Sequence, residues 1–188
     1  MTKKQEDWIH VGYRIFAYEG PQKLKVERLA KQVGKNKSSF YHFFADLVVF
    51  TEQLLAFHME QAYIMAEKEA QCPSLDALID IIVEHKVDLL FNRQLRIHRT
   101  NPDFEACFEK TNELTGPALI GIWAKTLNLE DNSYLAGLVM RLGIENFYLQ
   151  ITDETINKEW LSAYFQEFQQ LVQAFKSMKG LPTLDGTV

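Results

Sequence analysis

Apolar and polar residues alternate along the chain with the period of an α-helix, and no segment shows the two-residue period of a strand. The first periodic segment covers residues 6–18 and stops at the Gly20-Pro21 pair, a strong helix-breaking signal. We therefore predict an amphipathic helix at the start of the chain. Its apolar positions are Trp8, Val11, Ile15 and Phe16.

Two shorter helices are predicted next. One covers residues 26–33, where the apolar positions share one narrow face and Gly34 supplies a left-handed C-cap. A polar run over residues 35–39 then leads into a third helix, with Asn36 or Ser38 available as its N-cap. The apolar face of that third helix is formed by Phe40, Phe43 and Phe44.

The middle of the chain continues the helical pattern. A long helix over residues 47–70 ends at the Cys72-Pro73-Ser74 turn, and Ser74 opens another whose apolar face extends to Leu90. After a turn at Asn101-Pro102-Asp103, helical spacing resumes on both sides of the Gly116-Pro117 pair. The sequence therefore predicts an all-α fold.

The last two predicted helices, over residues 133–151 and 155–178, carry more aromatic residues than one small domain covers. We expect them to pair with the same helices of a second copy in a four-helix bundle. The tail from Gly180 is expected to be frayed. The predicted dimer interface contains Phe147, Trp160, Tyr164 and Phe168.

Charge is distributed unevenly. Residues 1–46 hold nine lysines and arginines against five acids, a balance of +4, and since the whole chain carries −5 the remainder carries −9. A basic module that meets phosphates, joined to an acidic body that DNA repels, fits this polarity.

Several other classes of protein lack support in the sequence. No stretch reaches 18 apolar residues and the start has no apolar core, so we expect a cytoplasmic protein with no membrane span. Cys72 and Cys107 lack metal-type spacing and are expected to be buried thiols. The histidines do not recur at i, i+4, and we expect neither a metal nor another cofactor. With no nucleophile elbow, phosphate-cradling loop or paired carboxylates, no enzyme activity is expected.

The segment around Gly34 has the layout of a helix-turn-helix, a helix followed by a tight turn and a second short helix. The second helix enters the major groove of DNA, so it must expose short donors near its N-terminus and bury its other face. The donors are Lys35, Asn36, Lys37, Ser38, Ser39 and His42. Because one such helix reads few base pairs, we expect a homodimer on a palindromic double-stranded operator.

The first fifty residues resemble the N-terminal signature of TetR-family transcription regulators. The resemblance rests on Ile15-Phe16-Ala17-x-x-Gly20, on Val26-x-x-Leu29-Ala30-x-x-Val33-Gly34, and on Asn36-Lys37-Ser38-Ser39-Phe40-Tyr41-His42-x-Phe44. It implies a DNA-binding domain over residues 1–46 and an effector-binding and dimerisation domain over residues 47–188. By this resemblance Tyr41 and His42 contact phosphates, residues 35–39 face the base edges or flanking backbone, and Lys25 opens the second helix.

Two positions depart from the family pattern. Lys25 stands where the family usually has a threonine that caps the helix and meets a phosphate, and Leu47 stands where it usually has a lysine. Losing one phosphate contact lowers the salt dependence of binding by about one unit of slope.

The helical body is expected to hold an apolar pocket for an unidentified small-molecule effector, with His58 or His98 as its polar anchor. Ordinary core packing is the alternative reading of the same side chains. The resemblance implies a repressor. The alternatives are a ligand-binding or interaction module with a decayed DNA-binding head and a small helical enzyme. The candidate pocket residues are Phe57, His58, Met65, Phe91, Phe104, Phe108, Trp123, Met140 and Phe147.

Overall fold

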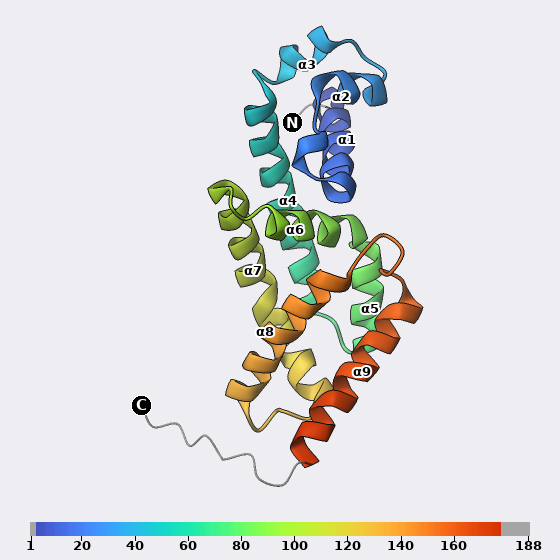
Figure 1. The fold of residues 1–188 in the computed structure, drawn as a ribbon, viewed down its shortest axis with the longest axis vertical. Helices are drawn as coiled ribbons and strands as arrows, with labels where there is room; N and C mark the ends of the chain where they lie inside the picture. The colour runs from blue at the N-terminus through green and yellow to red at the C-terminus, as the bar shows by residue number, and fades with distance from the viewer. Residues whose placement is uncertain (1–2, 178–188) are drawn as a thin grey trace.

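The structure, a computed structural model, describes residues 3–177 and consists over that range of helices and their connections, which confirms the predicted all-α fold (Figure 1). The tail from Gly180, predicted to fray, lies outside the described residues. In chain order the elements are α1 (Lys3–Glu19), the 3-10 turn η1 (Pro21–Lys23), α2 (Val26–Val33), α3 (Lys37–Phe43), α4 (Leu47–Ala70), α5 (Leu75–Glu84), α6 (Lys86–Ile97), α7 (Pro102–Thr126), α8 (Ser133–Gln150) and α9 (Lys158–Ser177).

Side-chain caps set several helix starts. The Asp46 carboxylate accepts hydrogen bonds from the backbone N–H groups of Val48 and Val49 at the start of α4. Ser74 caps α5 and Asn132 caps α8 in the same way. Each cap satisfies backbone donors that have no partner within the helix, which is why these boundaries could be predicted from the sequence.

The structure corrects two predicted helices. The helix expected from Ser74 to Leu90 is divided at His85, which ends α5 and begins α6, and the buried His85 ring lies against Asp88, with Nδ1 and Oδ2 2.8 Å apart. The last helix begins at Lys158 rather than at 155, because Thr152 and Thr155 exchange hydrogen bonds in a local turn.

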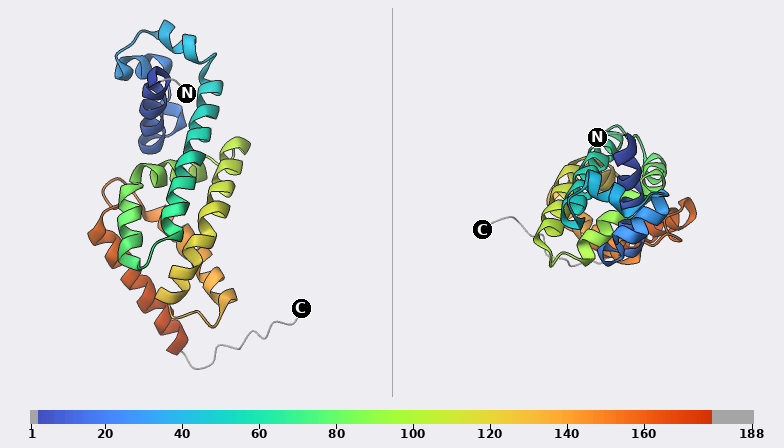
Figure 2. Two further views of the ribbon diagram at one scale, coloured as in Figure 1. Left: turned by 180° about the vertical axis from the view of Figure 1, so that it is seen from behind. Right: turned by 90° about the horizontal axis from the view of Figure 1, so that it is seen from above.

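The molecule is elongated, with α1, α2 and α3 forming a head at one end and α4 to α9 forming a body (Figures 1 and 2). Helix α4 runs from the head into the body, where it packs along α7, and α1 lies on α6. The apolar core continues across the junction, where the rings of Phe16 and Phe91 stack 4.1 Å apart. The division into domains of residues 1–46 and 47–188 therefore remains a prediction.

Within residues 3–177, no single helix has the length and apolar composition needed to cross a membrane. Helices α3 and α4 reach that length and composition only when taken together, and the chain bends by 64° between them.

Candidate functional site

Helices α2 and α3 are joined by a three-residue turn, Gly34 to Asn36. Gly34 has φ 70°, the left-handed conformation that glycine adopts without steric cost, and the next N–H reaches back from Lys35 to the carbonyl of Ala30 at 2.9 Å. Asn36 then caps α3 by accepting from the Ser39 N–H. These contacts fix the angle between the two helices and build a helix-turn-helix.

Helix α3 lies at the free end of the head (Figure 1). Its inner face holds Phe40, which is fully buried against Trp8 of α1 and Phe50 of α4. Its outer face carries most of the donors predicted to meet DNA, and Tyr41 is 56% exposed. Of the predicted DNA-binding residues, Ser39 is half-buried, and the exposed ones are Lys25, Lys35, Asn36, Lys37, Ser38, Tyr41 and His42.

Ion pairs within the head modify this surface. Lys37 Nζ lies 2.5 Å from Glu27 of α2, and Arg28 pairs with Glu19 of α1. Both pairs are at least partly exposed, so each contributes little to stability. Lys4 of α1 lies beside Lys35, Ser39 and His42 around a hollow in the head. Lys4 is not among the residues predicted to bind DNA, although it belongs to the basic N-terminal segment.

The residues at the start of α4 do not suit the binding of a phosphate. Leu47 is half-buried, Val48 is 67% exposed, and the Asp46 carboxylate occupies the first free backbone donors of the helix. A carboxylate there opposes the approach of a phosphate, since both favour the positive end of the helix dipole.

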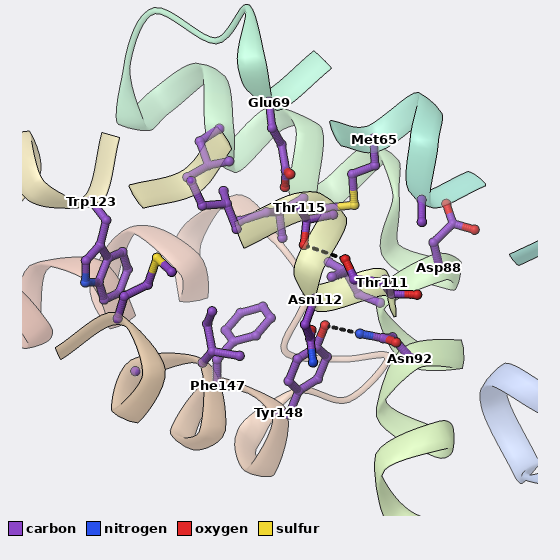
Figure 3. Close-up of a pocket in the computed structure, with 18 of the residues that line it drawn as sticks. Met65, Glu69, Asp88, Asn92, Thr111, Asn112, Thr115, Trp123, Phe147 and Tyr148 are labelled. Atoms are coloured by element: carbon purple, nitrogen blue, oxygen red, sulfur yellow. Dashed lines mark hydrogen bonds between the residues drawn. The ribbon is translucent and has the colours of Figure 1, made fainter. Parts of the chain in front are cut away.

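The body contains a cavity of about 100 Å³ between α4, α5, α6, α7, α8 and α9 (Figure 3). By the same measure a single water needs ~10–15 Å³, so the space is large enough for a small molecule. Most of its wall is apolar or aromatic. The predicted effector-pocket residues that line it are His58, Met65, Trp123, Met140 and Phe147.

The other predicted pocket residues do not line this cavity. Phe91 is fully buried between Phe16 and His58, and Phe104 packs edge-on against Phe16, so both belong to the core that joins head and body. Phe57 packs against Tyr13 of α1. Likewise Phe108 contacts the ring of Tyr148 from outside the cavity wall, and His98 lies near Gln22.

The aromatic residues predicted for a dimer interface are largely used within the subunit. Tyr164 is buried and donates its hydroxyl to the carbonyl of Gly143 at 3.0 Å, and with Phe147 it lines the cavity. Trp160 stacks on Tyr164, and Phe168 packs against Trp123. Phe147, Trp160 and Phe168 remain half-buried in the single subunit, so the dimer interface expected at these residues stays a prediction. The large apolar side chains that α8 and α9 leave exposed are Tyr134, Leu142, Leu149, Leu171 and Phe175.

Sequence reasoning missed the most unusual residue of the cavity, Glu69. Its side chain extends from the last turn of α4 into the cavity, is 1% exposed, and has no hydrogen-bond partner for either carboxylate oxygen (Figure 3). Burial raises the pKa of this carboxyl to about 8. The helical period could have found it, because His58, Ala62 and Met65 precede it on the same face of α4.

The remaining acid of the cavity wall, Asp88 of α6, has hydrogen-bond partners within the protein. It accepts hydrogen bonds from the Tyr13 hydroxyl at 2.7 Å and lies 2.8 Å from His85 Nδ1. Next to it His58 is fully buried, and burial lowers the pKa of its imidazole to about 4, so the ring is neutral. Asn92 faces His58 at 3.4 Å and donates to the Tyr148 hydroxyl at 2.6 Å. This chain of polar groups connects α1 of the head with the cavity wall.

Both cysteines are free thiols, Cys107 buried and Cys72 half-buried, and burial raises the pKa of Cys107 to about 11. Over residues 3–177 no three histidine, cysteine or acidic side chains are grouped so that they could hold a metal ion.

The arrangement of a helix-turn-helix head on an all-helical body is shared with solved structures assigned to the TetR family of transcriptional regulators. One, from Rhodococcus sp., superposes with a TM-score of 0.58 at 13% identity, covering 93% of this chain and 98% of its own. Another, from Mesorhizobium loti, gives 0.57 at 13% identity with the same coverage. No protein-family model and no curated protein matches the sequence. The chain therefore has the TetR-type fold, which confirms the predicted resemblance at the level of the fold.

Proposed function

We propose that the protein is a dimeric transcription regulator that binds a palindromic DNA operator through its head and responds to a small molecule bound in the cavity of its body. The observation that carries this proposal is the two-sided character of α3. Phe40 anchors one face in the core, and the opposite face exposes Lys37, Tyr41 and His42 at the free end of the molecule. A recognition helix needs this division to enter the major groove.

Charge supports the same assignment. The head has a balance of +4 and the rest of the chain −9, so DNA is attracted to one end and repelled by the other. The exposed leucines and aromatic residues of α8 and α9 are available for pairing with a second copy, which would present two recognition helices about 34–36 Å apart.

An effector could act through α4 and α6. Both helices line the cavity and both contact α1 of the head, so a ligand that favours one arrangement of these helices changes the placement of the recognition helix. Repression relieved by the effector is the outcome that the family resemblance favours.

Selection of bound fragments from the source genome, followed by a salt titration of the best fragment, tests the proposal. We expect a palindromic fragment whose binding weakens steeply with salt, and a Lys37→Ala, Tyr41→Ala variant with lower affinity and a flatter slope. Lys110→Ala, an exposed lysine of α7, is the control and should leave the slope unchanged.

Absence of any fragment that exceeds random DNA at moderate salt would instead support the second candidate, a ligand-binding module with a decayed head. Leu47 and the Asp46 cap, which remove a phosphate anchor at the start of α4, are the observations that favour it.

A further inference from the structure

Among the described residues, the wall of the cavity in the body is formed by acidic, neutral polar and apolar side chains, with no lysine or arginine. Glu69 and Asp88 are its two acids, its one histidine is the neutral His58, and neither lysine nor arginine lines it within the described part of the chain. Because Asp88 is already hydrogen-bonded to Tyr13 and His85, Glu69 is the carboxyl group that remains free to meet a ligand.

The buried Glu69 side chain lowers the stability of the protein when no ligand is bound. A buried carboxyl without a hydrogen-bond partner loses the solvation it has in water, whichever protonation state it adopts. Its position in the last turn of α4 adds to the cost of the anion, since the helix dipole places negative potential there. A positive group bound beside it would remove both penalties.

The surrounding wall suits the rest of such a ligand. Trp123, Phe147 and Tyr148 lie around the space that Glu69 faces (Figure 3). Aromatic faces attract cations as well as apolar groups.

We propose that the cavity binds a small organic amine in its protonated form, with the ammonium group against Glu69 and an apolar or aromatic body against the wall formed by α7 and α8. This inference rests on the proposed function only in naming the amine as the effector; the binding site itself does not depend on it.

Three probes of matched shape test the charge preference: 4-phenylbutylamine, 4-phenylbutan-1-ol and 4-phenylbutyrate, each titrated calorimetrically into the full-length protein at pH 7. We expect the amine to bind at least tenfold more tightly than the alcohol, and the carboxylate not to bind. Glu69→Gln should reduce the amine preference at least tenfold. Glu67→Gln, which removes an exposed acid of the same helix, is the matched control and should preserve it.

Proton release gives a second readout. Since burial keeps Glu69 largely protonated at pH 7, binding of the ammonium should release nearly one proton to the buffer, and Glu69→Gln should abolish that release. The other titratable side chains of the wall are Asp88, His58, Tyr148 and Tyr164. Titrations in buffers of different ionisation enthalpy measure the release.

Equal binding of amine and alcohol, tighter binding of the carboxylate, or no binding of any probe to the wild-type protein would overturn the inference. These three measurements use the wild-type protein, so they test the inference even if the Glu69→Gln variant fails to fold. Repeating the operator titration with amine present separates the two proposals. If the amine binds but DNA affinity does not change, the amine site stands and the amine is not the effector. If the protein binds an operator but no amine, the regulator proposal stands and the amine site is refuted.

Discussion

The hydroxyl of Tyr13 on α1 lies 2.7 Å from Nδ1 of His58 on α4. The same hydroxyl donates its single proton to the Asp88 carboxylate, also at 2.7 Å. One buried oxygen of the head is thus bonded to two helices of the body. Because His58 and Asp88 also line the cavity, this contact connects the head directly with the cavity wall.

Removing that oxygen should weaken the junction. We expect Tyr13→Phe to lower the free energy of unfolding by about 1–3 kcal/mol, because Asp88 and His58 each lose a partner in a buried site. Urea unfolding monitored by circular dichroism measures the change. Tyr63→Phe, at an exposed position of α4, is the control and should change stability by less than ~0.5 kcal/mol. Equal effects of the two variants would show that the connection is energetically unimportant.

His58 should make the protein sensitive to acid. Its pKa is about 4 in the folded protein, against about 6.5 when unfolded, so below pH 6.5 the unfolded chain binds a proton that the folded chain does not. The stability this group contributes is complete above pH 6.5 and is lost as the pH falls toward 4. Relative to His58→Gln, the wild type should lose about 1–2 kcal/mol more between pH 7 and pH 5. His10→Gln, an exposed control, should retain the wild-type slope.

The pH dependence of stability that Glu69 causes should be opposite in sign to that of His58. The pKa of Glu69 rises to about 8 in the folded protein, against about 4.5 in the unfolded chain. The stability that this group contributes is therefore complete below pH 4.5 and is lost as the pH rises toward 8. Between pH 5 and pH 8, without a bound cation, the wild type should lose about 1–3 kcal/mol relative to Glu69→Gln. Urea unfolding at the two pH values measures this, and parallel curves for the two proteins would contradict it.

Leu47→Lys should strengthen DNA binding. A lysine at the start of α4 adds a positive charge at the edge of the head, where the wild type has a half-buried leucine beside Asp46. We expect the salt slope of operator binding to become steeper by about one unit. Ala70→Lys adds the same charge at the opposite, exposed end of α4 and should leave the slope unchanged.

Gly12 allows the close approach of α1 and α4. A Cβ atom at this position would lie 2.4 Å from the ring of Phe50, which is fully buried and has no room to move. Gly12→Ala should therefore destabilise the protein by about 1–3 kcal/mol. Gly121→Ala, where a Cβ meets nothing within 4 Å in the helix α7, should instead stabilise it by roughly 0.5–1 kcal/mol. Thermal unfolding compares the two, and a neutral Gly12 variant would show that the junction is loosely packed.

The helices and the recognition motif were predictable because their signals are local. Asp46, Ser74 and Asn132 cap helices within three residues of themselves, and Gly34 ends α2 by its own backbone conformation. The break at His85 was not predictable in this way. It coincides with contacts of the buried His85 ring to Asp88 and to Lys68, and Lys68 comes from another helix.

The candidate site could be predicted only in part. Aromatic residues at helical spacing mark a buried face, but spacing does not say which of them meets empty space. Phe91 and Trp123 carry the same pattern, yet Phe91 is stacked in the junction and Trp123 lines the cavity. In the same way Tyr164, expected at a subunit surface, turned out to be buried beside Gly143.

By itself the sequence determined the all-helical fold, the helix-turn-helix with its exposed donors, and the separation of basic head from acidic body, since each depends on period, capping or composition. Only the tertiary structure decided that Tyr13 is bonded to the cavity wall and that Glu69 is left without a partner. Those two facts depend on how α1, α4, α6 and α8 pack against one another, and a buried polar group is defined by the neighbours that packing provides or withholds.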